Sequence, residues 1–260
     1  MLGERGLTIS LLFLFLLLIS GANSIRRYFI DNECPGDSLW LGSVPAIGLL
    51  DFELPTGTLT IINADDHWRG RFYFRMHCAA HDRSGGFANF TCLTGDCRSN
   101  VMSCEGRDPA PPATAVVFEY QTNTGNIDPN NYSYYVDLVH GFNVPAVVAP
   151  LSGGQGQCQL AGCPADINKS CPTELQAYLD LFAKATRAGR RSGVTARATP
   201  RRPGGLLRGP VRRPRRLPAL GSGELVQGAC PLAHTWQYDD DRAIYSCAGA
   251  DFNITLCPSS

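Results

Sequence analysis

Three cysteines, Cys92, Cys97 and Cys104, lie close together in the sequence and could do chemistry. Thiols at such spacing bind metals or exchange electrons in a reducing compartment, whereas in an oxidising compartment they form disulfides. A zinc site would draw on Cys78, His81, Cys92 and Cys97, but their spacings match no common zinc-binding pattern. We therefore expect neither a metal nor another cofactor, and the choice between reactive thiols and disulfides depends on the compartment.

The N-terminus is typical of a secretory signal peptide. Its unbroken apolar run, Leu11–Ile19, is nine residues long, well short of the roughly 20 that a membrane span needs. Small residues before the candidate sites permit cleavage after Ala22 or after Ser24. We expect a signal peptide at residues 1–24 and a secreted, extracellular or cell-wall protein, with a signal anchor as the alternative. No later stretch predicts a membrane span. In that compartment the eleven cysteines predict disulfides with one cysteine left over.

An arginine-rich tract interrupts the chain. The chain is formally neutral, with 23 basic and 23 acidic residues, but residues 187–216 hold eleven arginines and no acid. Gly and Pro are frequent there, and no apolar period could bury a face, so we expect residues 186–223 to be disordered. The alternatives are a processing site at "RRPRR" and a mis-assembled gene. Because the tract has no aromatic residues, we expect no nucleic-acid partner.

The rest of the chain has to be built mostly from strands. Short β-branched or aromatic runs bounded by Gly, Pro, Asn and Asp predict strands at residues 57–64, 70–78, 114–122, 132–139 and 251–257. Only residues 173–186 carry a helical period. These elements predict an all-β sandwich or barrel with a disulfide-rich appendage.

Five motifs then occur in order along the chain: "TCLTGDC" (91–97) with Cys104 behind it, "PPAT" (111–114), "HGFNVP" (140–145), "CPAD" (163–166) and "YDDDRAIYSCAGADFNITLCP" (238–258). Through them the chain resembles the thaumatin-like proteins, a pathogenesis-related family of plants. The resemblance runs from about Tyr28 to Leu175 and resumes at about Gly228. It implies a flattened thaumatin-like β-sandwich over residues 25–260. A disulfide-clamped loop subdomain is expected at 78–108, and a degenerate second domain that contains the arginine tract at 164–230.

The resemblance also implies how the cysteines pair. The expected disulfides are Cys34–Cys257, Cys78–Cys92, Cys97–Cys104, Cys158–Cys247 and Cys163–Cys230. Fuller members of the family carry further cysteines between positions 171 and 230, and this chain lacks them. Cys171 is therefore expected to have lost its disulfide partner.

By the same resemblance, the working surface is a cleft lined by one arginine and four acidic residues, which binds β-1,3-glucan and in some members cuts it. Arg75 stands at the position of the arginine, and Asp239 or Asp240 at that of the last acid. For Arg75 and Asp239 a structural ion pair and a binding role are equally open.

The other three acids of the cleft are replaced here. Val117, Tyr135 and His140 stand where the family has carboxylates. Glu119 could partly substitute for the first of them, because residues two apart on a strand share a face. Tyr135 could stack on a sugar, although packing is the commoner role of a strand tyrosine.

Hydrolysis of a glycoside ordinarily needs two carboxyls at a set separation, and this cleft has lost most of its acids. We expect a monomeric, secreted, defence-related protein that binds β-1,3-glucan or a related polysaccharide and is not an efficient enzyme. A weak antifungal endo-β-1,3-glucanase and a non-binding wall or interaction protein are the alternatives. Secretion would also expose four Asn-x-Ser/Thr sequons, of which at least one should carry a glycan: Asn89, Asn131, Asn168 and Asn253.

Overall fold

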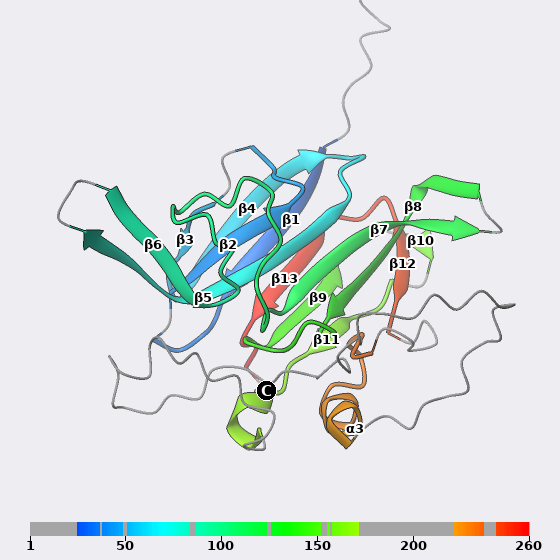
Figure 1. The fold of residues 1–260 in the computed structure, drawn as a ribbon. Coiled ribbons are helices and arrows are strands. Elements are labelled where there is room, and N and C mark those ends of the chain that lie inside the picture. The colour runs from blue at the N-terminus through cyan, green and yellow to red at the C-terminus, as the bar shows by residue number, and fades with distance from the viewer. Residues whose placement is uncertain are drawn as a thin grey trace, which may run out of the picture.

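The structure is a computed structural model that describes residues 25–36, 38–48, 51–83, 87–123, 126–151, 155–156, 158–171, 221–236 and 243–259. Within these ranges nearly all of the regular structure is β-sheet, and the two short helices lie together at one end of the sheets (Figure 1). No helix of this described part is long and apolar enough to cross a membrane. The predicted all-β class is confirmed.

One sheet has five strands. Its order is β11 (Ala161–Cys163), β9 (Ala146–Pro150), β13 (Phe252–Leu256), β1 (Ile25–Asn32) and β4 (Thr58–Asp65). β1 runs parallel to β13, and the other neighbours are antiparallel. The first and last described strands therefore lie side by side in the middle of this sheet.

The other sheet has eight strands. Its main path is β10 (Gln155–Gly156), β12 (Tyr245–Ala248), β8 (Asn126–Asp137), β7 (Ala115–Asn123), β5 (Gly70–Arg83), β2 (Leu39–Val44) and β3 (Glu53–Leu54). The eighth strand, β6 (Phe87–Thr94), pairs only with β5. The pair β5–β6 extends beyond the rest of the sheet at one side of the molecule (Figure 1).

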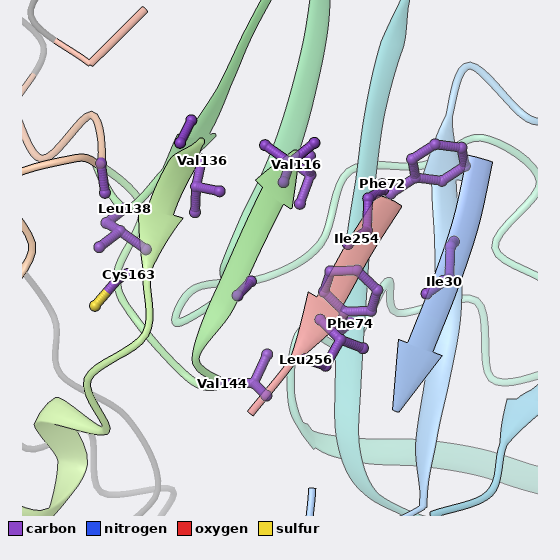
Figure 2. Close-up of a cluster of buried hydrophobic side chains, with 14 of the residues drawn as sticks. Ile30, Phe72, Phe74, Val116, Val136, Leu138, Val144, Cys163, Ile254 and Leu256 are labelled. Atoms are coloured by element: carbon purple, nitrogen blue, oxygen red, sulfur yellow. The ribbon is translucent and has the colours of Figure 1, made fainter. Parts of the chain in front are cut away.

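The core lies between the facing surfaces of the two sheets. On β13, the apolar residues Phe252, Ile254 and Leu256 are buried and alternate with partly exposed polar ones, as one solvated face requires. Phe72 and Phe74 of β5 belong to the same cluster, and Figure 2 shows Ile254 and Leu256 beside them. Truncating one such phenylalanine to alanine typically costs about 3–5 kcal/mol. This packing holds the sandwich together.

The helices are short and were not predicted. The 3₁₀ helix η1 spans Ile167–Ser170, and α3 spans Gly221–Ala229. α3 begins at Gly221, so its first three residues fall within the segment 186–223 that was expected to be disordered, and the buried residues Val226 and Cys230 anchor its C-terminal part. Residues 186–220, the predicted helix at 173–186 and most of the expected second domain lie outside the described residues.

Five disulfides cross-link the fold: Cys34–Cys257, Cys78–Cys92, Cys97–Cys104, Cys158–Cys247 and Cys163–Cys230. They are the pairs that the resemblance implies. The first joins the ends of β1 and β13, and the last fixes α3 to β11. The eleventh cysteine, Cys171, is buried and packs within the main core.

Candidate functional site

The outer face of the eight-stranded sheet, which points away from the core, gathers the residues that could act on a ligand. The register places Arg71 beside Val117, and Val117 beside Tyr135. Since alternate residues of a strand share a face, this face carries Arg71, Tyr73 and Arg75 of β5, Ala115, Val117 and Glu119 of β7, and Tyr135 and Asp137 of β8.

The disulfide loop (residues 95–114) covers one side of this face. Its disulfide, Cys97–Cys104, packs with Tyr73, Ala115 and Val117 in a second buried cluster. The hydroxyl of Tyr73 donates to the carbonyl of Arg107 at 3.0 Å. Val117 is thereby left only 6% exposed. A glutamate at position 117, as the resemblance would have it, would be buried under the loop in this chain.

Arg75 lies beneath the disulfide loop and not on an open surface. It is 1% exposed, and its guanidinium donates to the carbonyls of Met102 at 2.8 Å and Leu41 at 3.3 Å. Burial lowers the pKa of Arg75, and the nearby Asp51 carboxylate, 3.9 Å away, opposes this effect. Of the two roles that the sequence leaves open for Arg75, this geometry supports the structural one.

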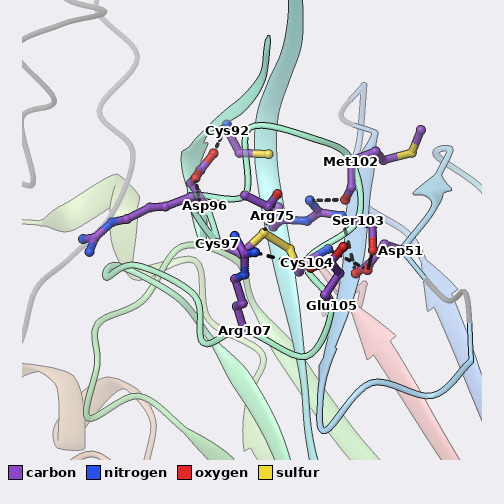
Figure 3. The surroundings of a disulfide bond; sticks show 12 residues. Asp51, Arg75, Cys92, Asp96, Cys97, Met102, Ser103, Cys104, Glu105 and Arg107 are labelled. Atoms are coloured by element: carbon purple, nitrogen blue, oxygen red, sulfur yellow. Dashed lines mark hydrogen bonds and ion pairs between the residues drawn. A yellow bond between two sulfur atoms is a disulfide. The ribbon is translucent and has the colours of Figure 1, made fainter. Parts of the chain in front are cut away.

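Asp51 completes the attachment of the loop. Its carboxylate accepts hydrogen bonds from the amide of Cys104 at 2.7 Å and from the hydroxyl of Ser103 at 3.0 Å. Figure 3 shows Arg75 and Asp51 approaching the same turn of the loop, next to the Cys97–Cys104 disulfide. A charged pair thus fastens the loop to the sheet at the position where the resemblance predicts a ligand-binding arginine.

Glu119 and Tyr135 meet on the part of the face that carries more exposed side chains. The Tyr135 hydroxyl donates to Glu119 Oε1 at 3.2 Å. Burial of Tyr135, together with the carboxylates of Glu119 and Asp137, raises the pKa of its hydroxyl, so that it stays a hydrogen-bond donor at physiological pH. Glu119 itself is exposed. These two predicted site residues therefore form one hydrogen-bonded unit.

Asp137 lies between two histidines. Its carboxylate is 3.4 Å from His140 Nδ1 and 3.6 Å from His234 Nδ1, and it accepts the amide of Val139 at 2.9 Å. Burial alone would raise the pKa of Asp137, but the two imidazoles and the amide hold it well below its usual range. The contact with Asp137 in turn raises the pKa of His140 against the opposing effect of burial.

His234 connects this group to Tyr135. Its ring meets the Tyr135 ring edge-on, with centroids 5.4 Å apart. Two backbone hydrogen bonds, from Leu138 to His234 and from His234 to Val136, tie its segment to the end of β8. We call Glu119, Tyr135, Asp137, His140 and His234 the β8 polar cluster. Asp137 and His234 were not predicted, although Asp137 follows Tyr135 by two residues and so falls on the same face.

Within the described residues, the two carboxyls of the β8 polar cluster, Glu119 and Asp137, lie at well-separated positions along their strands. Glu119 pairs in register with Ser133, four residues from Asp137 along β8, which places their backbones about 13 Å apart along the strands. The carboxyls of glycosidases are about 5–9.5 Å apart. In addition, Asp137 is held ionised and has no proton to donate. The candidates Asp239 and Asp240 lie outside the described residues.

The cluster can instead form hydrogen bonds with a polar ligand. Glu119 offers an exposed acceptor, and His140, whose side chain is 63% exposed, offers a donor. Among the described residues, no group of three or more His, Cys, Asp or Glu side chains is arranged to hold a metal ion.

Comparisons with known proteins identify the family. The model of the thaumatin family matches residues 32–258. Thaumatin-like protein 1 of Prunus persica is 35% identical over 99% of this chain and 100% of its own length. A protein of Prunus avium named glucan endo-1,3-beta-glucosidase is 33% identical over 94% of this chain and 95% of its own length. The solved structure of the thaumatin-like xylanase inhibitor TLXI aligns with 89% of this chain and 99% of its own, at 18% identity and a TM-score of 0.46. The extent of the family match and of these relatives shows that the chain belongs to the thaumatin family.

Proposed function

We propose that this protein is a secreted, defence-related protein that binds β-1,3-glucan or a related wall polysaccharide through the β8 polar cluster, without efficient hydrolysis. Membership of the thaumatin family supports the class, and five disulfides fit an extracellular protein. The observation that carries the proposal is how few exposed acidic side chains the β8 polar cluster has. Asp137 is locked between two histidines, Val117 and Tyr135 have replaced two expected carboxylates, and Glu119 alone is an exposed acid of the cluster.

Sugar binding needs hydrogen-bond partners held in place before the ligand arrives. Tyr135 is fixed by Glu119 and by the ring of His234, and His140 is oriented by Asp137. Each pair leaves polar atoms of Glu119 and His140 accessible to sugar hydroxyls. The cluster is therefore pre-ordered by its own contacts.

A co-sedimentation assay on insoluble β-1,3-glucan tests the proposal. We expect the full chain to sediment with the glucan and to release no reducing sugar. The double variant Glu119→Gln, His140→Ala should bind at least about tenfold more weakly, as the loss of two hydrogen bonds to charged groups implies. Lys169→Gln, an exposed change on η1, is the matched control and should bind as the native chain does. Equal binding by the double variant would contradict the assignment of the surface.

Weak glucanase activity is the second candidate, because a relative of 33% identity carries that enzyme's name. Its acids would have to include Asp239 or Asp240. Reducing sugar released by the native chain, and lost in Asp239→Asn with Asp240→Asn, would favour this candidate. A chain that neither sediments with glucan nor releases sugar would favour a non-binding wall protein.

A further inference from the structure

The outer face of the five-stranded sheet exposes an unusual number of apolar side chains. Ile25 of β1 is 63% exposed, and Leu59 and Ile61 of β4 are 56% and 50% exposed. The register places Phe29 of β1 directly beside Ile61. Because the exposed Arg27 separates Ile25 from Phe29 on this face, we call Phe29, Leu59 and Ile61 the β1–β4 apolar patch. Such a grouping on a soluble protein ordinarily marks a surface that something covers, and β4 is also the end strand of its sheet.

Asn253 lies next to this patch. The register aligns Asn253 with Phe29 on one side and with Ala149 on the other, so a single row crosses the sheet from Ile61 through Phe29 to Asn253. Neighbouring strands are about 4.8 Å apart. The burial pattern of β13 turns Asn253 and Thr255 outward. An atom bonded to the Asn253 amide is therefore within reach of the Phe29 ring.

The sequence around Asn253 is an acceptor for N-glycosylation. Asn253, Ile254 and Thr255 form an Asn-x-Thr sequon, and Asn253 Nδ2 donates to Thr255 Oγ1 at 3.0 Å. The amide thus faces outward and is hydrogen-bonded to the hydroxyl of its own sequon. A sugar on Nδ2 would project over the sheet without disturbing the core.

Asn168, in the other sequon with a described side chain, is placed quite differently. Its Nδ2 donates to the carbonyl of Asn143 at 3.0 Å, and its Oδ1 is buried. A glycan on this amide would have to occupy the space between η1 and the segment of Asn143. The side chains of Asn89 and Asn131 lie outside the described part of the chain.

We propose that Asn253 carries an N-linked glycan whose first sugars cover the β1–β4 apolar patch, and that Asn168 carries none. In the transfer, Nδ2 of Asn253 forms a bond to the anomeric carbon of an oligosaccharide bound to a lipid diphosphate. The bond from that carbon to the phosphate oxygen breaks, the lipid diphosphate leaves, and Nδ2 loses one proton. The C–H face of the first pyranose packs against the Phe29 ring, whose face carries partial negative charge. The inference rests on secretion, which is part of the proposed function, but not on glucan binding.

Site mapping by mass spectrometry tests the assignment. The full chain is produced in plant cells, and peptides from both the medium and the secretory compartments are treated with a glycan-releasing amidase in water enriched in the heavy oxygen isotope, which enters the aspartate formed at each released site. We expect the label at Asn253 and none at Asn168. Asn253→Gln and Thr255→Ala should each remove one glycan from the intact mass, whereas Thr255→Ser should keep it and Asn168→Gln should leave the mass pattern unchanged. An unmodified Asn253 in every fraction, or a labelled Asn168, would overturn the proposal, whatever the glucan assay shows.

A separate experiment tests whether the glycan covers the β1–β4 apolar patch. Enzymatic removal of the glycan under native conditions should shift the protein toward larger species in size-exclusion chromatography and increase the binding of an apolar dye. The same treatment of a Leu59→Thr, Ile61→Thr variant should produce neither change, because threonine keeps the strand propensity and removes the apolar surface. A deglycosylated native chain that stays monomeric and binds no more dye would show that the glycan does not cover the patch.

Discussion

At the scale of single residues, Asp137 determines which hydrogen bonds and proton transfers are open to the β8 polar cluster. Its two imidazole neighbours, His140 and His234, keep it ionised, and its carboxylate orients His140 in return. Alternation along a strand was enough to predict that Glu119 shares the face of Val117. The same rule would have found Asp137 in "YYVDLV". His234 could not have been found, because it comes from a segment distant in the sequence whose backbone hydrogen bonds to β8 correspond to no sequence pattern.

The Asp137–His140 pair predicts a pH-dependent stability. The pKa of His140 is raised in the fold, so its contribution is present below its unfolded pKa of about 6.5 and is lost as the pH rises through the folded value. The pKa of Asp137 is lowered, so its contribution is present above about pH 4 and is lost in stronger acid. Stabilisation by the pair is therefore greatest in the mildly acidic range.

Asp137→Asn should accordingly destabilise the protein by about 1–3 kcal/mol at pH 5 and by less at pH 8, where a smaller fraction of His140 is protonated. Because the His140 side chain is largely exposed, solvent screening places the difference between the two pH values below 1 kcal/mol. Urea unfolding measures both, and the difference should shrink in a His140→Gln background, in which His234 remains beside Asp137. The same loss of stability at pH 5 and pH 8 would contradict the proposed coupling.

At the scale of elements, the disulfide loop depends on a buried charge pair beneath it. Arg75 reaches both the loop and β2, and Asp51 holds the turn at Ser103 and Cys104. The sequence predicts that Arg75 lies in a strand but not that it is buried. Alternation along a strand tells which face of the sheet a side chain is on, but it does not tell which other segment covers that face. The same limit applies to Val117, which the loop also buries.

Arg75→Met should lower the free energy of unfolding by about 3–5 kcal/mol, because it removes the positive charge that balances the carboxylate of Asp51 next to the core. Arg107→Gln is the control on the same loop. Its exposed contact with Glu105 is worth at most about 1 kcal/mol. Denaturant unfolding gives both values, and faster proteolysis within the loop should accompany only Arg75→Met. Comparable stability of the two variants would mean that Arg75 is not what fastens the loop.

Part of the set of strands could be predicted from the sequence. Five predicted runs correspond to β4, β5, β7, β8 and β13, with ends shifted by a few residues. The strand β9, "AVVAP", was missed because its first three residues are all buried and show no alternation. β1 was missed in a segment where charged residues alternate with the buried ones.

For the whole molecule, the Cys34–Cys257 disulfide closes the sandwich by joining its first and last described strands. The resemblance supplied this pairing, and spacing alone could not, since eleven cysteines allow many connectivities. The parallel pairing of β1 with β13 could not be predicted either, because it is a tertiary contact that no local sequence pattern indicates. Both features make the fold depend on contacts between the two ends of the chain.

Removing this disulfide should cost more than removing one that closes a short loop. The chain-entropy relation gives about 5 kcal/mol for a separation of 223 residues and about 3 kcal/mol for the 14 residues of Cys78–Cys92. The paired serine variants at each disulfide, compared by guanidinium unfolding, measure the difference. A larger loss at Cys78–Cys92 would show that native-state effects outweigh closure of the chain.

We propose that the chain recognises a wall glucan but does not cut it efficiently. The most direct measurement follows bound protein and soluble reducing sugar in the same samples of β-1,3-glucan, from acidic to neutral pH. We predict sedimentation of the protein with the glucan and no sugar above the blank at any pH, because the loss of a positioned acid or base costs about 10²–10⁴ in rate. Clear release of sugar by the native chain, abolished by Asp239→Asn with Asp240→Asn, would contradict the account.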